Sequence, residues 1–250
     1  MEDFIQTIKK AAVPGFVFVV FCIIAAGLFL VSCDAKQYIT LNRDGSGTCR
    51  LSCTLDHSLV EYILDIGEAA GYFEDREKAA VFDIAQIKET IKTQKGISLV
   101  SCTSSKKNSL ELVVSFTHIN TLISSQNFFG KSKMISFTTV QNVNTLNLHF
   151  DQHIFELFLD EMSMFSPEDY EYFLPQKNET KESYFETLDF SLENGAQLLK
   201  NSTISVEISA PGEIVNHNGK KIRPNTIQFL LPLEYIVFPE KPRDFFIQYK

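Results

Sequence analysis

Cys49, Cys53 and His57 have the C-x3-C-x3-H spacing of a set of metal ligands. On a helix these positions share one face, and two thiolates and an imidazole would suit zinc. Here Cys49, Leu51, Cys53 and Leu55 alternate with polar residues, which predicts a strand. At about 3.3 Å rise per residue the two cysteines are roughly 13 Å apart, too far to share one zinc ion or to bridge each other. The pattern therefore predicts no metal site.

The two cysteines have two remaining interpretations. Both lie on the apolar face of the expected strand, where small buried hydrophobic side chains are typical. In an exported protein, either Cys49 or Cys53 could instead form a disulfide with Cys102, which would leave the other unpaired.

Other candidate catalytic residues also lack a suitable setting. His149 and His153, with Asp151 between them, span the end of an expected strand and the start of a helix, so a solvated pair is expected. Ser104 and Lys107 match the S-x-x-K spelling of a serine-lysine pair, but that chemistry needs a helix, and these residues fall in a polar turn. We therefore predict no catalytic residue, no metal and no cofactor other than covalent lipid. A hydrolytic site assembled in space from distant residues stays an alternative.

Cys33 is the residue whose chemistry the surrounding sequence does specify. Lys9 and Lys10 precede the uncharged segment 16–31, and small Ser32 stands before the cysteine, as in a secretory signal. The sequence Leu30-Val31-Ser32-Cys33 resembles the lipobox of bacterial lipoproteins. The resemblance implies that the signal 1–32 is removed and that Cys33 carries a diacylglycerol thioether, with fatty chains such as palmitate. Two such chains contribute about 20 kcal/mol of membrane affinity at roughly 0.8 kcal/mol per buried CH2.

An uncleaved transmembrane helix is the alternative, since the segment 11–31 is free of charge and about 20 apolar residues span a bilayer. Pro14 and Gly15 interrupt that run. Both readings place the remainder outside the cytoplasm on a membrane. Asp34 resembles a signal that retains lipoproteins in the inner membrane, but the rule varies between bacteria, so inner and outer membrane stay open.

The chain has a net charge of -8, contains 22 phenylalanines and lacks tryptophan. This acidity disfavours nucleic acid and anionic headgroups as partners. Lys220, Lys221 and Arg223 form a compact basic group beside the turn Asn218-Gly219. They are the candidate interaction surface, although a solvated hairpin tip is the simpler explanation.

The periodicity of the remaining sequence predicts an α+β domain over 33–250. Strands are expected around the turn Asp44–Gly47, at 97–103, 110–116, 134–140 and 145–150, and again from 204 to the C-terminus. Helices are expected near 58–95, as a helical hairpin laid on a mainly antiparallel sheet, and near 151–200, as a helical insertion. Ser58 with Glu61, and Ser183 with Glu186, match the capping box that opens a helix.

Two stretches together carry a resemblance to a family. The lipobox followed by a strand-DGSG-strand hairpin, and the C-terminal STISVEISAPGEIVNHNG with NTIQFLLPL, resemble the LppM-type lipoprotein domain and related uncharacterised lipoproteins of spirochaetes. These motifs cover under a third of the chain. The resemblance implies an extracytoplasmic α+β domain, and it supplies no catalytic residues.

Three hypotheses follow for function. The first is a non-enzymatic, membrane-anchored lipoprotein that binds a protein, glycan or lipid at the cell envelope, or has a structural role there. The second is an envelope hydrolase, which requires polar groups converging in a pocket. The third is a lipid-carrying module, which requires an apolar cavity.

Overall fold

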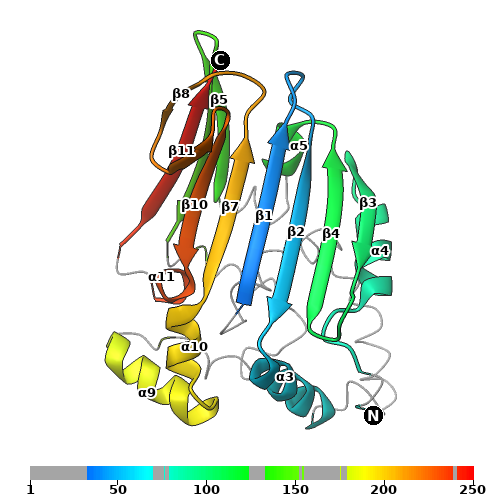
Figure 1. The fold of residues 1–250 in the computed structure, drawn as a ribbon, viewed down its shortest axis with the longest axis vertical. Coiled ribbons are helices and arrows are strands. Elements are labelled where there is room, and N and C mark those ends of the chain that lie inside the picture. The colour runs from blue at the N-terminus through cyan, green and yellow to red at the C-terminus, as the bar shows by residue number, and fades with distance from the viewer. Residues whose placement is uncertain are drawn as a thin grey trace.

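The computed structural model of the 250-residue chain describes residues 33–69, 76, 79–123, 133–151, 154, 175, 179–238 and 241–250. The signal segment 1–32 and, within the helical insertion expected near 151–200, the residues 152–153, 155–174 and 176–178 lie outside these residues. The remainder folds into two β-sheets with helices at both ends and along one edge of the larger sheet, which confirms the predicted α+β class (Figure 1).

Sheet A has seven strands in the order β3-β4-β2-β1-β7-β10-β9. Neighbouring strands are antiparallel except β1 and β7, which run parallel. The strands are β1 (Cys33–Leu41), β2 (Gly47–Leu55), β3 (Ile97–Thr103), β4 (Ser109–Phe116), β7 (Thr203–Ser209), β9 (Lys220–Arg223) and β10 (Thr226–Pro232).

The β1–β2 hairpin shows why the sequence folds in this way. Gly45 has a φ of +80°, which glycine adopts without steric cost, and the Asp44 carboxylate accepts a hydrogen bond from the Ser46 backbone N–H at 3.0 Å. Beyond the turn, odd-numbered residues of β2 face the core and most even-numbered residues face solvent. The hairpin predicted from the alternation is confirmed.

Sheet B has four strands in the order β5-β6-β11-β8, all antiparallel. They are β5 (Ile135–Val140), β6 (Val143–Phe150), β8 (Ile214–His217) and β11 (Arg243–Tyr249). The regular C-terminal strand was predicted to lie inside a sheet, and β11 indeed pairs with a strand on each side.

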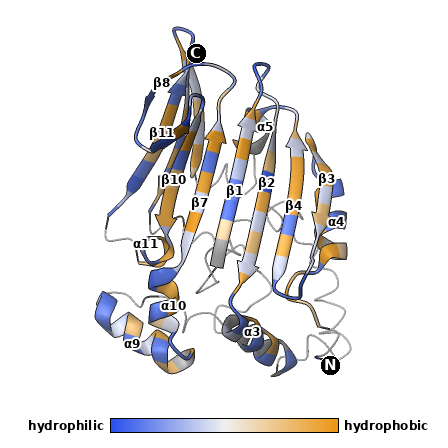
Figure 2. Cartoon of the chain, viewed as in Figure 1, coloured by the Kyte–Doolittle hydropathy of each residue, from blue (hydrophilic) through white to orange (hydrophobic). Residues whose placement is uncertain are grey.

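The two sheets meet through aromatic side chains. Phe229 of β10, in sheet A, is 2% exposed, and its ring centroid lies 5.5 Å from that of Phe245 in sheet B, edge to face. Buried apolar residues of both sheets belong to one cluster. Apolar and polar residues alternate along the strands of both sheets (Figure 2), as expected when one face is buried.

The helices lie at the two ends of sheet A and along one of its edges, with α5 beside the β1–β2 turn. They are α3 (His57–Ala69), α4 (Ile84–Lys92), α5 (Ile119–Ile123), α9 (Lys181–Ser191), α10 (Gly195–Asn201) and α11 (Leu233–Val237). Figure 1 shows α3, α9 and α10 at the end of the sheet where β1 begins.

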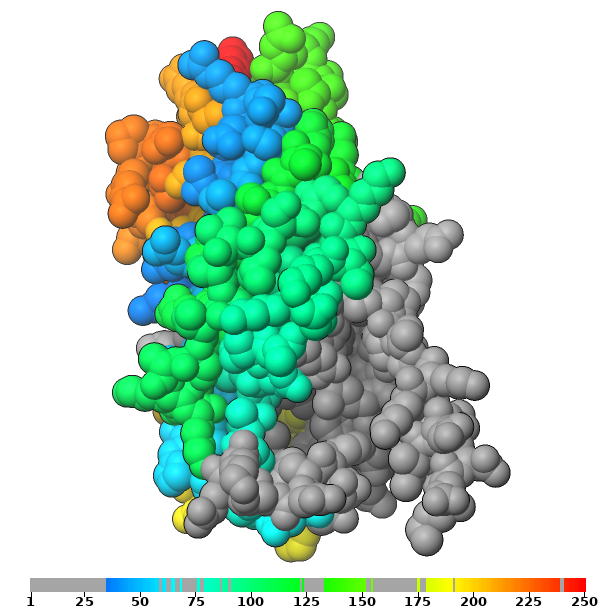
Figure 3. All heavy atoms as spheres, turned by 90° about the vertical axis from the view of Figure 1, so that its right-hand side faces the viewer, coloured from blue at the N-terminus to red at the C-terminus, as the bar shows by residue number. Residues whose placement is uncertain are grey.

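The predicted helical hairpin is only half right. Both helices exist, but α4 packs beside β3, burying Ile87 and Ile91, while α3 lies at the end of the sheet. Figure 3 shows α4 and β3 side by side on the surface at this edge. The apolar stripe of α4 is covered by the sheet and not by α3. The spacing of apolar residues shows that a helix has a buried face, but it does not show which element covers that face.

Both predicted capping boxes are wrong in detail. The Asp56 carboxylate accepts from the Ser58 N–H at 2.8 Å, and the Thr180 hydroxyl accepts from the Ser183 N–H at 3.2 Å. The capping residue therefore lies two positions earlier than expected in α3 and three positions earlier in α9, and the Glu61 side chain contacts Arg76 instead.

Candidate functional site

Cys33 is the first residue of β1, in the interior of sheet A. Its backbone lies opposite Leu55, and Asp34 lies opposite Thr54 on one side and Thr203 on the other. Helix α3 begins two residues after Leu55, and α10 ends two residues before Thr203. The chain therefore enters the folded body between α3 and α10, with no linker between position 33 and the sheet.

The structure does not form the disulfide predicted between Cys102 and Cys49 or Cys53. Cys49 lies opposite Val114 of β4, Cys53 opposite Leu110, and Cys102 opposite Leu112 from the other side. Strand β4 thus separates Cys102 from both cysteines by two strand spacings, roughly 9.6 Å, whereas a disulfide needs Cα atoms within about 7 Å. The three cysteines are buried, as the other interpretation expected.

Burial changes the chemistry of these thiols. It raises the pKa of Cys49 to about 11, although a hydrogen bond donated by Gln37 Nε2 at 3.3 Å acts in the opposite direction. Burial also raises the pKa of Cys102. A thiol that stays protonated is neither a nucleophile nor a metal ligand, so these residues are core and not a site.

The structure does bring Lys220, Lys221 and Arg223 together, on β9 at the edge of sheet A. All three residues are exposed. Charged residues on a short edge strand prevent pairing with a strand of another chain, so this group has a role that needs no ligand. Its use as an interaction surface stays a prediction.

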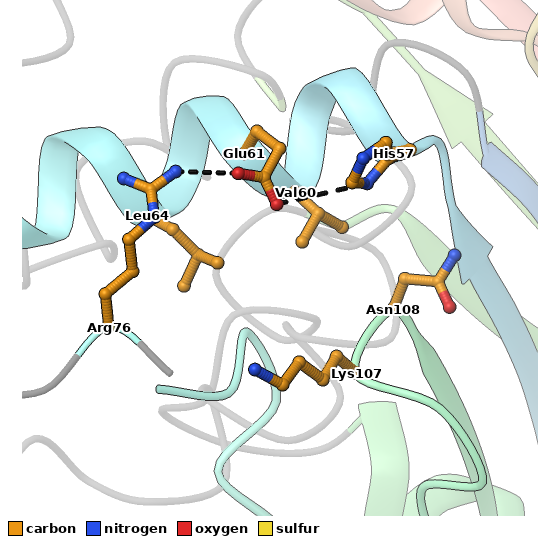
Figure 4. A pocket seen from close by; sticks show the side chains of 7 residues that line it. All are labelled: His57, Val60, Glu61, Leu64, Arg76, Lys107 and Asn108. Atoms are coloured by element: carbon orange, nitrogen blue, oxygen red, sulfur yellow. Dashed lines mark hydrogen bonds and ion pairs between the residues drawn. The ribbon is translucent and has the colours of Figure 1, made fainter. Parts of the chain in front are cut away.

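A pocket of about 460 Å³ opens between α3 and the β3–β4 turn (Figure 4). Val60 and Leu64 of α3 provide its apolar lining. His57 and Glu61 of α3 and Arg76 lie on one side, and Lys107 and Asn108 lie on the other. Two hydrogen bonds fix the turn to the sheet. The Asn108 side-chain Nδ2 donates to the Leu55 carbonyl at 2.7 Å, and the Leu55 backbone N–H donates to the Asn108 carbonyl at 2.8 Å. Because Leu55 is opposite Cys33, the pocket lies at the end of the sheet where β1 begins.

Arg76 is the centre of an ion-pair network at one side of this pocket. Its guanidinium contacts Glu61 at 2.7 Å, Glu68 at 3.3 Å, and Asp65, all on α3. Hydrogen bonds to Asp65 and Glu61 raise the pKa of Arg76 above its ordinary value. The three carboxylates together outweigh this one cation, so Arg76 serves to fasten α3 and not to attract an anion.

The lining combines several polar side chains with two apolar ones. None of the seven described lining residues carries a hydroxyl or thiol, so they supply no nucleophile of the serine or cysteine type. His57 Nδ1 lies 3.9 Å from Glu61 Oε1, beyond hydrogen-bond distance, and its side chain is 86% exposed. The donors and acceptors that remain can hold a polar ligand. Sequence reasoning missed this pocket because it assigned Glu61 to a capping box and had no pattern for Arg76.

A second hollow lies between Phe150, Tyr235, Arg243 and Phe245, with a volume of about 10 Å³. A space of this size holds about one water molecule. It is too small for an acyl chain, so this hollow gives no support to the lipid-carrying hypothesis.

His149 stands between two carboxylates. Its Nδ1 lies 2.8 Å from Asp244 of β11, and its Nε2 lies 3.2 Å from Asp151. The hydrogen bond to Asp244 raises the pKa of His149, with a smaller contribution from Asp151, and the same bond lowers the pKa of Asp244. With both ring nitrogens engaged, His149 joins β6 to β11 and is not a solvated residue as predicted. Its expected neighbour His153 lies outside the described residues.

In the part of the chain that the structure describes, no three His, Cys, Asp or Glu residues are grouped so as to hold a metal ion. None of the described helices combines the length and the hydropathy that a membrane span needs.

No protein-family model matches the sequence. No curated protein matches it either. Among solved structures, the chain is similar to the NMR structure of the folded domain of LppM from Mycobacterium tuberculosis, with 10% sequence identity and a TM-score of 0.42. The match covers 87% of this chain and 89% of that one. This is the family that the sequence motifs resemble, but a likeness of this size carries no argument about function.

Proposed function

We propose that this protein is an extracytoplasmic lipoprotein, held on a bilayer by lipid on Cys33, whose α+β body is a non-enzymatic binding module of the cell envelope. The observation that carries the proposal is the position of Cys33. It follows an apolar segment that ends in Leu30-Val31-Ser32, and it is the first residue of the central strand β1. The end of the apolar segment and the start of the folded body therefore coincide.

The pocket between α3 and the β3–β4 turn supports binding in preference to hydrolysis. Its described lining offers one carboxylate, an amide, an imidazole, an ammonium group and a guanidinium group around two apolar side chains, and no hydroxyl or thiol nucleophile. Such a lining suits a polar ligand, either a segment of an envelope protein or a glycan. Its place beside the start of β1 would bring that ligand close to the membrane.

Substitution of Cys33 tests the anchor. We expect the wild-type protein, expressed in its native host, to partition into the membrane fraction with a mature N-terminal peptide that begins at a diacylated Cys33. Cys33→Ala removes the sulfur that accepts the lipid, so this modified peptide should disappear from the mass spectrum.

Cys22→Ser is the matched control, because it replaces the other cysteine of the same N-terminal segment and should leave the modification intact. A natural protein that begins at Met1 with an unmodified Cys33 would contradict the proposal.

A photo-crosslinking amino acid at position 57 tests the binding module. The His57 side chain lines the pocket and is 86% exposed, so a replacement there leaves the core intact. We expect a discrete crosslinked partner in native cells, and none from Val140, which is 66% exposed in the β5–β6 hairpin. The same pattern of adducts at both positions would exclude the pocket as the binding site.

A further inference from the structure

Phe190, in the last turn of α9, is 94% exposed, more than any other large apolar residue exposed among those described. The others are aliphatic residues on strands and in a hairpin, with exposed fractions of 44% to 66%. A phenylalanine so open to water contributes almost nothing to the core. Its position relative to Cys33 suggests what it contacts.

The connections of sheet A place Phe190 beyond the point where the chain enters the body. Thr203 lies opposite Asp34, and α10 ends at Asn201, two residues earlier. Figure 1 shows α10 continuing from the base of β7 away from the sheet, with α9 crossing its far end. The seven residues of α10 span about 10 Å at 1.5 Å per residue. The corner between α9 and α10 therefore projects by about this distance past the level of Cys33.

This corner is rigid. The Asp189 carboxylate accepts a hydrogen bond from the Ala196 N–H at 2.7 Å, which joins the end of α9 to the start of α10. Lys181, at the other end of α9, forms an ion pair of 3.2 Å with Glu234 of α11. Tyr184 and Leu188 bury the opposite face of α9 in the core. Phe190 is therefore presented on a fixed support and not on a loop.

We propose that Phe190 is a second, non-covalent membrane contact, inserted at the boundary between headgroups and acyl chains of the bilayer that holds the lipid of Cys33. The inference rests on the proposed lipid anchor. With no linker at position 33, the anchor brings the helical end of the body to the bilayer, and amphipathic surface elements penetrate it by about 5–10 Å. That depth matches the projection of the corner. The lipid supplies the affinity, and Phe190 fixes the orientation of the body.

The charges around Phe190 specify the kind of bilayer. Glu186, Asp189 and Glu193 are exposed on the same corner. These carboxylates repel anionic headgroups and attract the ammonium groups of zwitterionic ones. We therefore assign the contact to a bilayer surface rich in phosphatidylcholine or phosphatidylethanolamine.

The absence of tryptophan from the chain makes a direct test available. Phe190→Trp, in the full lipidated protein, places the sole indole at the proposed contact. Val140→Trp, in the β5–β6 hairpin at the opposite end of the molecule, is the matched control (Figure 1). Each variant is bound to phosphatidylcholine vesicles with brominated acyl chains, which quench tryptophan on contact, and flotation of the vesicles measures binding independently.

We expect both variants to float with the vesicles, and the emission of Phe190→Trp to shift to shorter wavelength and to be quenched several-fold more than that of Val140→Trp. Replacing part of the phosphatidylcholine by phosphatidylglycerol should weaken the quenching at position 190. If both variants float and are quenched equally, the contact at Phe190 is refuted while the lipid anchor stands. If neither floats, the anchor itself fails and the contact fails with it.

Discussion

The cysteines of the folded body illustrate how strand register decides the chemistry of single residues. Cys49 and Cys102 are both buried, yet β4 lies between their strands, and burial holds the pKa of both thiols above the ordinary value. An exported protein encounters oxidising conditions, in which accessible thiols pair. Here the sheet itself keeps these thiols apart and protonated.

We predict that Cys49 and Cys102 of the native protein resist iodoacetamide at mildly alkaline pH, because burial suppresses the reactive thiolate. In concentrated guanidinium chloride without reductant, Cys49, Cys53 and Cys102 should all become alkylated, as mass spectrometry of tryptic peptides would show. Cysteines that become labelled only after reduction would demonstrate a disulfide and contradict the register described for sheet A.

The ion pair of His149 with Asp244 predicts a pH dependence of stability. The folded pKa of His149 is raised above 6.5, so its contribution is full below that pH and is lost as the pH rises through the folded value. The folded pKa of Asp244 is lowered below 3.8, so its contribution is full above that pH and is lost on acidification. The pair should therefore stabilise the fold most between these two values.

We expect His149→Asn to lower the free energy of unfolding by about 0.5–1 kcal/mol within this window, since the pair is partly exposed, and to have less effect at alkaline pH. Urea denaturation over a pH series measures the difference. His57→Asn, with a side chain that is 86% exposed, is the matched control. An equal loss of stability at all pH values would show that packing, and not the charge of His149, is responsible.

At the scale of elements, one aromatic contact joins sheet A to sheet B. Phe229→Ala should lower the free energy of unfolding by about 3–5 kcal/mol, because it removes a buried ring and its contact with Phe245. Chemical denaturation monitored by circular dichroism measures the change.

Phe190→Ala makes the same chemical change at the most exposed of the described phenylalanines and should alter stability by no more than about 0.5 kcal/mol. Similar losses in both variants would mean that Phe190 packs against the body, which would also exclude its contact with a membrane.

The same scale shows what the sequence could predict. The hairpin around Gly45 and the strand that ends at Tyr249 were predictable, because an apolar period of two specifies a half-buried strand by local pattern alone. The helices α3, α4 and α9 were predictable as helices because their apolar residues recur at the helical spacing of three to four positions. The placement of α4 on β3 was not, since an apolar stripe does not identify the surface that covers it.

At the scale of the whole molecule, the candidate site shows the same limit. Cys33 could be proposed as a lipidation site from the sequence because the four residues 30–33 that resemble a lipobox are contiguous. The pocket was not, because Glu61 and Arg76 meet Lys107 and Asn108 only after α3 has reached the β3–β4 turn. The disulfide prediction was wrong because pairing with Cys102 depends on strand order, and no local spacing reveals which strand lies between two others.

The parallel pairing of β1 with β7 has a consequence for the time at which the chain matures. β1 pairs with β2, which follows it directly in the sequence, and with β7, which is synthesised about 170 residues later, since Asp34 lies opposite Thr203. Contacts between such distant segments form late, because a long loop must close first. If the protein is exported and acylated as proposed, position 33 leaves the translocation channel before β7 does. Position 33 is therefore accessible to the modifying enzymes while sheet A is still incomplete. In a pulse-chase experiment, acylation should precede the acquisition of protease resistance.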